Sequence, residues 1–444
     1  MPRLLPLAVL AVAAPLALVG TQAFAQDVAF YDGNADGQPD TLIPESAWPS
    51  WATRGTGSPT VVFDRGAEEW VMLFEARLSD EFLDGTGMDW DECRPREDGP
   101  RVVWGIGRAT SPDGLTGWTV DAEPVVTPVP GTWRPCSTAH PWIVAYEDTW
   151  HLYYKAEQGF DPCNPGGDES PWGCSRMTGV GYATSSDGGR TWNEQDGADP
   201  MLSIGDFGFP TVVVRQEEGA AVDDEQWTML LTRADGLYLA QSPAPDQGWE
   251  FSEANPVLTP GTWTFAQDEW FQPSLTCSAQ GEAFRYIAWI GGNSVAGGSG
   301  FDNLRAEFPD EWVGDGSPVI AWDADPVWRH WDAVRIGDET YVYYTVRDEE
   351  NKVFVQLMKT GASTTFDLDP AIWNGRACLY GERPEDPTDG TDDTDTGDTG
   401  GTDDTDSDPG GCYCSSSASP LTAAPLLGLL ALVGLSRRRR HGSR

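Results

Sequence analysis

The chain has 444 residues and a formal net charge of −42, with 70 Asp and Glu residues against 28 Lys and Arg. So acidic a surface repels polyanions, which makes nucleic acid and anionic membrane surfaces poor partners. The 21 tryptophans are many for this length, and such side chains pack sheets and also stack on sugar rings.

The first 25 residues have the pattern of a secretory signal peptide. Arg3 supplies a positive start, residues 4–18 are apolar, and residues 23–25 read Ala-Phe-Ala, a small-x-small cleavage site. The alternative is a membrane anchor, but the apolar run is short and the cleavage site is good. We therefore expect export and removal of residues 1–25.

An internal repeat runs through residues 26–383. Each unit begins with Pro or its equivalent, continues with a β-branched run, and follows a turn with an aromatic strand. Residues 58–63 and 70–74 show this pattern in the first unit, and residues 140–144 and 150–154 show it in the second. The five units place one residue each just before the Pro position: Ser58, His140, Phe209, Gln272 and His330.

Each unit then continues into a third and a fourth strand. The fourth carries a Pro-Val-like signature at residues 123–126, 199–202, 255–258 and 317–320. Four short strands repeated five times, without an amphipathic helix, predict an all-β fold, a five-bladed β-propeller with four antiparallel strands per blade. Closing the ring would bury each blade against its neighbours, and residues 27–51 are expected to help close it.

The end of the chain has a spacer and a sorting signal. Residues 384–411 are almost all Asp, Thr, Gly, Ser and Pro, a composition that predicts a disordered acidic spacer. Residues 412–444 hold a Cys-Tyr-Cys site, an apolar run shorter than the about 20 residues of a membrane span, and four consecutive arginines at 437–440. This order resembles the myxobacterial-type C-terminal sorting domain (MYXO-CTERM). The resemblance implies processing near the cysteines and retention at the outer cell surface, with this anchor as the membrane attachment.

Six cysteines lie in the repeat region, and an oxidising destination favours disulfides. Cys163 and Cys174 bracket one Gly/Pro-rich loop and are the predicted pair. Cys93 with Cys136, and Cys277 with Cys378, are the remaining candidate pairs. Because no Cys/His spacing suggests zinc, no metal ligand is predicted from this pattern.

The repeat resembles the five-bladed glycosidase propellers, among them glycoside hydrolase families 32, 43, 68 and 130, over about residues 52–375. A motif between the third and fourth strands of the second unit also fits the Asp-box of sialidases, a turn motif. The resemblance implies an axial pocket for carbohydrate, lined by the residue before each inner-strand Pro. The Asp-box residues are Ser185, Asp187, Gly189, Thr191 and Trp192.

In family 43 the first three of these positions carry the catalytic Asp, Asp and Glu. Here Ser58, His140 and Phe209 occupy them, and Ser and Phe cannot do the proton transfer of carboxylates. Two alternatives stay open. The protein hydrolyses O-glycosyl bonds with carboxylates from neighbouring positions, or it is a non-catalytic glycan-binding, adhesion or structural envelope protein. The candidate carboxylates are Glu75, Glu157, Asp268, Glu269 and Asp332.

Basic residues at the ends of second strands would suit an acidic sugar, because guanidinium pairs with carboxylate in a bidentate way. These binding candidates are Arg77, Arg233 and Arg347, and Lys155 ends the second such strand. A solvated loop or a salt bridge between blades is the alternative for each. His140 and His330 fall on equivalent positions, where a hydrogen-bonded core role, a ligand-binding pair and an axial cation site are the options. No other cofactor is expected, and the protein is expected to be a monomer.

Overall fold

The computed structural model describes a chain made mostly of β-strands. The predicted signal peptide, acidic spacer and sorting signal lie outside the described residues. Among those described, α1 (Asp80–Thr86) is the only α-helix, and no helix is long and apolar enough to cross a membrane. The structure describes residues 28–33, 35, 39–93, 101–146, 148–161, 174–195, 199–203, 208–217, 226–233, 235–261, 269–270, 273–280, 283–293, 299–306, 320–322, 329–336, 339–348, 352–360 and 377–380.

The first two repeat units form one nine-stranded sheet, in the order β10-β8-β7-β6-β4-β3-β2, with β5 and β9 at its side. Each unit is an antiparallel meander, and a single parallel bridge between Trp104 and Ser137 joins the two. The strands are β2 (Gly57–Asp64), β3 (Glu69–Arg77), β4 (Trp104–Ser111), β5 (Thr119–Val120), β6 (Ser137–Tyr146), β7 (Thr149–Asp161), β8 (Cys174–Ser185), β9 (Asn193–Glu194) and β10 (Leu202–Ser203).

Three further sheets hold the later units, in the orders β14-β13-β12-β11-β23, β15-β17-β18-β19 with β16 beside β17, and β1-β22-β21-β20. The strand β1 near the N-terminus pairs with β22, so it completes the last sheet. These strands are β1 (Val28–Phe30), β11 (Gly208–Glu217), β12 (Gln226–Arg233), β13 (Gly236–Ser242), β14 (Glu250–Phe251), β15 (Glu269–Trp270), β16 (Ser274–Gln280), β17 (Ala283–Asn293), β18 (Ser299–Ala306), β19 (Ile320–Trp322), β20 (Arg329–Ile336), β21 (Glu339–Arg347), β22 (Val353–Thr360) and β23 (Ala377–Tyr380).

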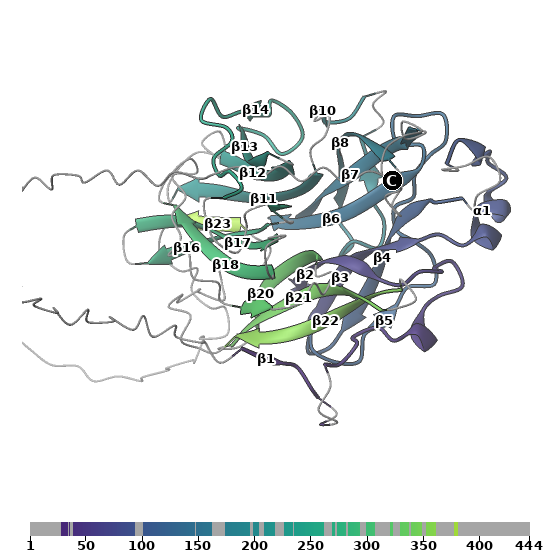
Figure 1. The fold of residues 1–444 in the computed structure, drawn as a ribbon, viewed down its shortest axis with the longest axis horizontal. Helices are drawn as coiled ribbons and strands as arrows, with labels where there is room; N and C mark the ends of the chain where they lie inside the picture. Colours follow the sequence, from purple (N-terminus) through teal and green to yellow (C-terminus); the bar gives the residue numbers. More distant parts are fainter. Residues whose placement is uncertain are drawn as a thin grey trace, which may run out of the picture. The chain divides into compact units, whose positions relative to one another are not determined.

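The first strands of the five units lie next to one another. The strands β2, β6, β11, β16 and β20 contact in that order, and β20 contacts β2 again. Hydrogen bonds cross between them: the Trp142 indole donates to the Val212 carbonyl at 2.7 Å, and the Val61 N–H donates to Asp332 at 2.6 Å. Figure 1 shows the last sheet beside β2 and β3, although the two segments are far apart in sequence.

Apolar side chains fill the space between neighbouring sheets. One cluster joins Trp51 and Phe74 of the first unit to Tyr343 of the last, and another joins Trp142 of the second unit to Trp227 of the third. The strands that contribute to these clusters are apolar on both faces, as strands covered on both sides must be. Most described tryptophans thus serve packing, which leaves few for a ligand surface.

The turn that fits the Asp-box is held by the Asp187 carboxylate. It accepts hydrogen bonds from the N–H groups of Arg190 and Thr191, both at 3.0 Å, and from the Thr191 hydroxyl at 2.6 Å. Burial raises the pKa of Asp187, but the hydrogen bonds from Thr191 and Ser185 outweigh it and lower this pKa to about 2. Asp113 holds an equivalent turn in the first unit, with N–H groups at 2.7 and 2.8 Å. The turn is thus a repeated structural device.

Of the candidate disulfides, the structure contains Cys93–Cys136. The predicted pair Cys163–Cys174 lies outside the described part of the structure, which includes neither Cys163 nor the side chain of Cys174. The side chains of Cys277 and Cys378 also lie outside the description. The observed bond links the 3₁₀ helix η2 (Asp91–Cys93), which follows α1, to the chain just before β6.

His151 is a buried histidine that should make stability depend on pH. Its Nδ1 lies 2.6 Å from the Tyr182 hydroxyl, and its ring packs against Trp227 with centroids 5.0 Å apart. Burial lowers the pKa of His151 to about 4, so between pH 6.5 and 4 the unfolded chain binds a proton that the folded chain excludes. Stability is therefore expected to fall as pH drops, by about 2 kcal/mol at pH 5 from this group.

Urea unfolding at pH 7 and pH 5 measures this contribution of His151. His151→Gln should lose that part of the pH dependence, and an unchanged pH dependence would contradict the assignment.

Candidate functional site

Four of the residues that precede the inner-strand Pro position share an unusual backbone conformation. Ser58, His140, Phe209 and His330 have φ values of 47°, 50°, 59° and 64°. The strand register shifts at each of these positions. A left-handed non-glycine residue costs of order 1–3 kcal/mol and persists where the surroundings enforce it, often at functional sites. The same strain at four equivalent places therefore points to a site. Gln272, the fifth, lies outside the described residues.

The side chains of these four residues meet. The His140 ring centroid lies 4.3 Å from that of Phe209 and 4.3 Å from that of His330, and Phe209 lies 4.8 Å from His330. The Ser58 hydroxyl lies 2.8 Å from His140 Nδ1. Residues of four different units thus converge where their first strands begin. We name Ser58, Glu75, His140, Lys155, Phe209 and His330 the axial cluster.

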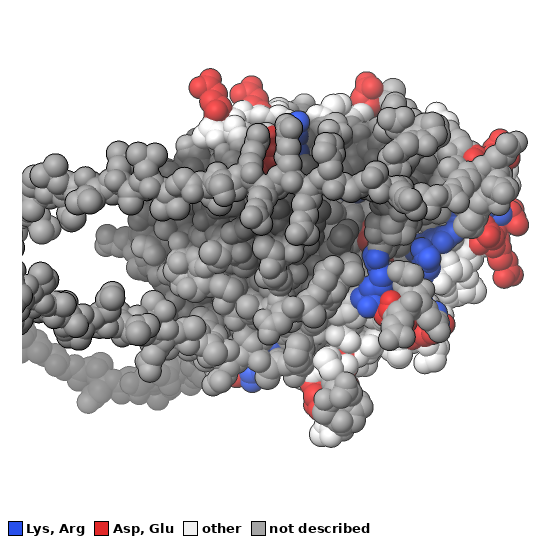
Figure 2. Space-filling view, viewed as in Figure 1, with Lys and Arg blue, Asp and Glu red and all other residues white. Residues whose placement is uncertain are grey.

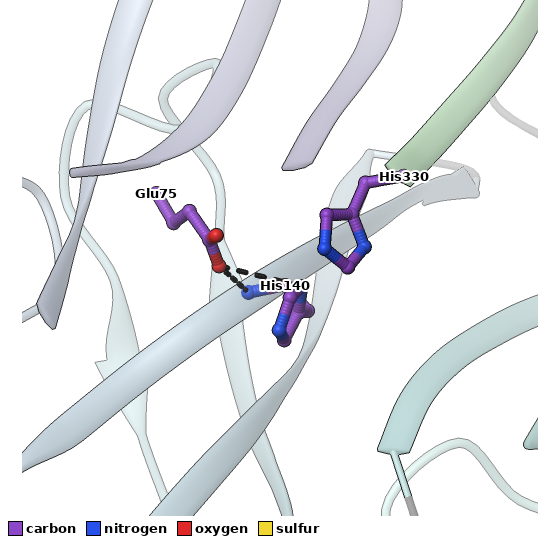
Figure 3. A group of neighbouring side chains, drawn as sticks. All are labelled: Glu75, His140 and His330. Carbon is purple, nitrogen blue, oxygen red and sulfur yellow. Dashed lines mark hydrogen bonds and ion pairs between the residues drawn. The ribbon is translucent and has the colours of Figure 1, made fainter. Parts of the chain in front are cut away.

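Glu75 brings a carboxylate into the axial cluster from β3. Its Oε2 accepts the His140 backbone N–H at 3.1 Å and lies 3.3 Å from His140 Nδ1 (Figure 3). The residue is 9% exposed. Of the two predicted carboxylates whose side chains the structure describes, Glu75 and Asp332, it is Glu75 that lies against His140.

Lys155 brings an ammonium group from β7. Its Nζ lies 5.5 Å from the centroid of the Phe209 ring, within the range of a cation–π contact, and the residue is 8% exposed. Thr345 on β21 contributes a hydroxyl that accepts the Ser58 backbone N–H at 2.9 Å. Thr345 could not be predicted from the sequence, because a threonine in an alternating strand resembles any other.

Asp332 has a different setting from Glu75. It is fully buried, and its carboxylate accepts the Val61 N–H at 2.6 Å and the Ser274 hydroxyl at 3.1 Å. These bonds join the last unit to the first and the fourth, which makes Asp332 a link between units. Of the remaining candidate carboxylates, Asp268 is not among the described residues, and the described part of the structure does not include the side chains of Glu157 and Glu269.

The predicted basic residues have different surroundings. Arg233 is 37% exposed at its side chain, pairs with Asp235 at 3.3 Å, and lies over the Tyr238 ring. Arg77 ends β3 and donates to the Arg101 carbonyl at 2.5 Å, and burial together with Arg54 lowers its pKa. Arg347 ends β21 opposite Val353.

Figure 2 shows acidic side chains gathered where α1 lies, with basic side chains beside them. Arg101 bonds to Asp80 at 3.0 Å and to Asp84 at 2.7 Å, and both acids belong to α1. Local ion pairs therefore engage part of the basic charge near Arg77.

The left-handed backbone at Ser58 yields a stability test. Both replacements remove the hydroxyl, but glycine adopts this conformation without penalty, whereas alanine keeps the strain. We expect Ser58→Gly to be more stable than Ser58→Ala by about 1 kcal/mol, measured by urea unfolding. Equal stabilities would mean that the backbone at this position is not under strain.

Three side chains of the axial cluster can hold a metal ion. One donor atom each from Glu75, His140 and His330 lies within 4.8 Å of the others, and all three residues are buried (Figure 3). An axial cation site was one of the three alternatives that the sequence left open for His140 and His330.

Comparison with known proteins shows the fold. No family model and no curated protein matches the chain. The beta-1,2-mannobiose phosphorylase from Listeria innocua, in complex with beta-1,2-mannobiose, is similar at 13% identity and a TM-score of 0.52, over 76% of this chain and 97% of that one. A structure named as a glycoside hydrolase is similar at 13% identity and a TM-score of 0.51, over 73% and 92%. The chain therefore has a propeller-type β-fold like that of glycoside hydrolases.

Proposed function

We propose that this protein binds carbohydrate at the axial cluster of a five-bladed β-propeller. The observation that carries the proposal is the convergence of Ser58, His140, Phe209 and His330, which share one strained conformation at equivalent positions. Maintaining strain in four units is costly, and a shared ligand site is a reason to keep it. The cyclic contacts of the five first strands support the five-bladed architecture.

The chemistry of the axial cluster suits a sugar. A ring of hydroxyl groups needs acceptors and donors together with an apolar surface for its C–H groups. Glu75, Lys155 and the histidines supply the polar groups, and Phe209 supplies an aromatic ring. The similar phosphorylase is seen with a disaccharide, which agrees with this use of the fold.

Binding is better supported than hydrolysis. Glycoside hydrolysis needs two carboxylates across the scissile bond, about 5 to 10 Å apart. Among the described side chains, Glu75 is the carboxylate seen in the axial cluster, and its Oε2 already accepts the His140 N–H. Hydrolysis of O-glycosyl bonds is the second candidate, because Glu75 supplies one of the two groups.

We place this activity at the outer cell surface. The signal peptide pattern, the acidic spacer of residues 384–411 and the sorting signal of residues 412–444 support export followed by anchoring. In this arrangement the spacer holds the domain away from the envelope, where it meets external glycans.

A glycan array tests binding, with the purified protein applied to neutral, uronic and sulfated sugars. We expect binding to a defined set of glycans, and at least about tenfold weaker binding by Phe209→Ala or Lys155→Met, since each removes a central contact. Glu339→Gln is the control, because Glu339 begins β21, at the opposite end of that strand from Thr345, and pairs with Lys359. Equal binding by all variants, or none by the native protein, would contradict the proposal.

Two further measurements refine it. Arg77→Ala with Arg347→Ala should weaken binding to acidic sugars, and an unchanged affinity would remove acidic sugars as the preferred class. Reducing sugar released from a polysaccharide panel, lost in Glu75→Gln, would favour the hydrolase.

A further inference from the structure

The donor set of the axial cluster is specific for one class of ion. Glu75 offers a carboxylate oxygen, and His140 and His330 each offer an imidazole nitrogen. Calcium and magnesium prefer six or more oxygen ligands, whereas imidazole nitrogen suits zinc and the other first-row transition metals. We propose that Glu75, His140 and His330 bind one first-row divalent transition metal ion, for which Zn²⁺ is the probe.

The spacing of the donors fits such an ion. Two ligands of a tetrahedral zinc ion with bonds of about 2.0–2.1 Å lie about 3.4 Å apart. The Oε2 of Glu75 and the Nδ1 of His140 are 3.3 Å apart. All three donors lie within 4.8 Å of one another, which brings a nitrogen of His330 within reach of the same ion. Three protein ligands leave a fourth position for water or for a ligand hydroxyl.

The surroundings hold these ligands in place. The His140 N–H donates to Glu75, which fixes the carboxylate against the ring that shares the metal. A metal on His140 Nδ1 would take the place of the contact that this nitrogen makes with the Ser58 hydroxyl at 2.8 Å, while packing of the His140 ring against Phe209, with centroids 4.3 Å apart, limits its rotation. Hydrogen bonds from neighbouring groups orient metal ligands and raise affinity. The site is therefore preorganised in the fold.

Metal binding here competes with protons. Only the deprotonated imidazole nitrogen and the carboxylate oxygen coordinate a metal ion. The affinity is thus expected to rise with pH. The proposal stands on the side chains of the axial cluster and does not require that a sugar binds.

The test is a calorimetric titration of the full, chelator-treated protein with Zn²⁺, without sugar, with Co²⁺ as a spectroscopic probe. The Asp-rich spacer and the cysteines at residues 412 and 414 also attract metals. The variants His140→Ala, His330→Ala and Glu75→Gln isolate the axial site from them. His151→Gln is the matched control, since His151 lies against Tyr182 and Trp227 instead.

We expect one tight Zn²⁺ equivalent, reduced at least about tenfold in affinity by each axial variant and unchanged in His151→Gln. Co²⁺ should show the intense visible absorption of a four-coordinate site, and an excess of Ca²⁺ should not displace it. Equal Zn²⁺ affinity in His330→Ala, or displacement by Ca²⁺, would overturn the proposal. In the native protein, a Co²⁺ spectrum without the near-ultraviolet charge-transfer band of thiolate ligands separates a nitrogen and oxygen site from Cys412 and Cys414, so this measurement decides the question even if a variant fails to fold. Because no sugar is present, a failure here leaves glycan binding to its own test.

Discussion

Replacing Cys93 and Cys136 by serine is expected to lower the free energy of unfolding by about 4 kcal/mol, from the entropy of a loop of this length. The two cysteines are 43 residues apart in sequence. Without the bond, the unfolded chain gains the freedom of that loop. The folded state gains nothing in return, because both side chains are buried among apolar residues that include Trp90 and Val103.

Urea unfolding of the double variant and of the native protein measures this effect. Adding reductant to the native protein should lower its midpoint toward that of the double variant. In the double variant, a much smaller response to reductant is expected, which separates this bond from any other in the chain. If the two proteins unfold at the same urea concentration without reductant, the bond does not stabilise the fold.

Replacing Asp332 by alanine is expected to destabilise the protein by about 3 kcal/mol or more, because a buried N–H and a buried hydroxyl lose a charged acceptor. The Val61 N–H donates to this carboxylate at 2.6 Å and the Ser274 hydroxyl at 3.1 Å. The Ser274 hydroxyl in turn accepts the Ala333 N–H at 3.1 Å. One side chain therefore supports the junction of three repeat units.

Glu339→Gln is the matched control, because Glu339 is a carboxylate of the same sheet in an ion pair with Lys359 at the surface. A pair of this kind contributes about 0–1 kcal/mol, so the control should change the unfolding midpoint little. Asp332→Asn is expected to lie between the two, since it keeps one acceptor oxygen. A loss in Asp332→Ala no larger than that of the control would show that the link between units is dispensable.

The candidate site was partly visible in the sequence. The alignment of the repeat units placed Ser58, His140, Phe209 and His330 at equivalent positions, and the structure brings these four side chains together. Glu75 was one of several candidate carboxylates, and nothing in the sequence separated it from Asp332. Their surroundings in the structure separate them: Glu75 lies against the His140 ring, whereas Asp332 accepts the Val61 N–H and the Ser274 hydroxyl.

The sequence by itself determined the β-rich repeat fold, because alternating and β-branched runs with turn residues at regular spacing restrict each segment locally to a strand. It also marked Cys93 with Cys136 as a candidate pair, and the structure forms that bond. Only the tertiary structure decided which charged residues meet. Contacts between distant segments produce the left-handed backbone of the four axial residues and the group of Glu75, His140 and His330. They also add β1 to the last sheet and β23 to the sheet of the third unit. Local preferences carry no information about such contacts, since they depend on how the sheets pack against one another.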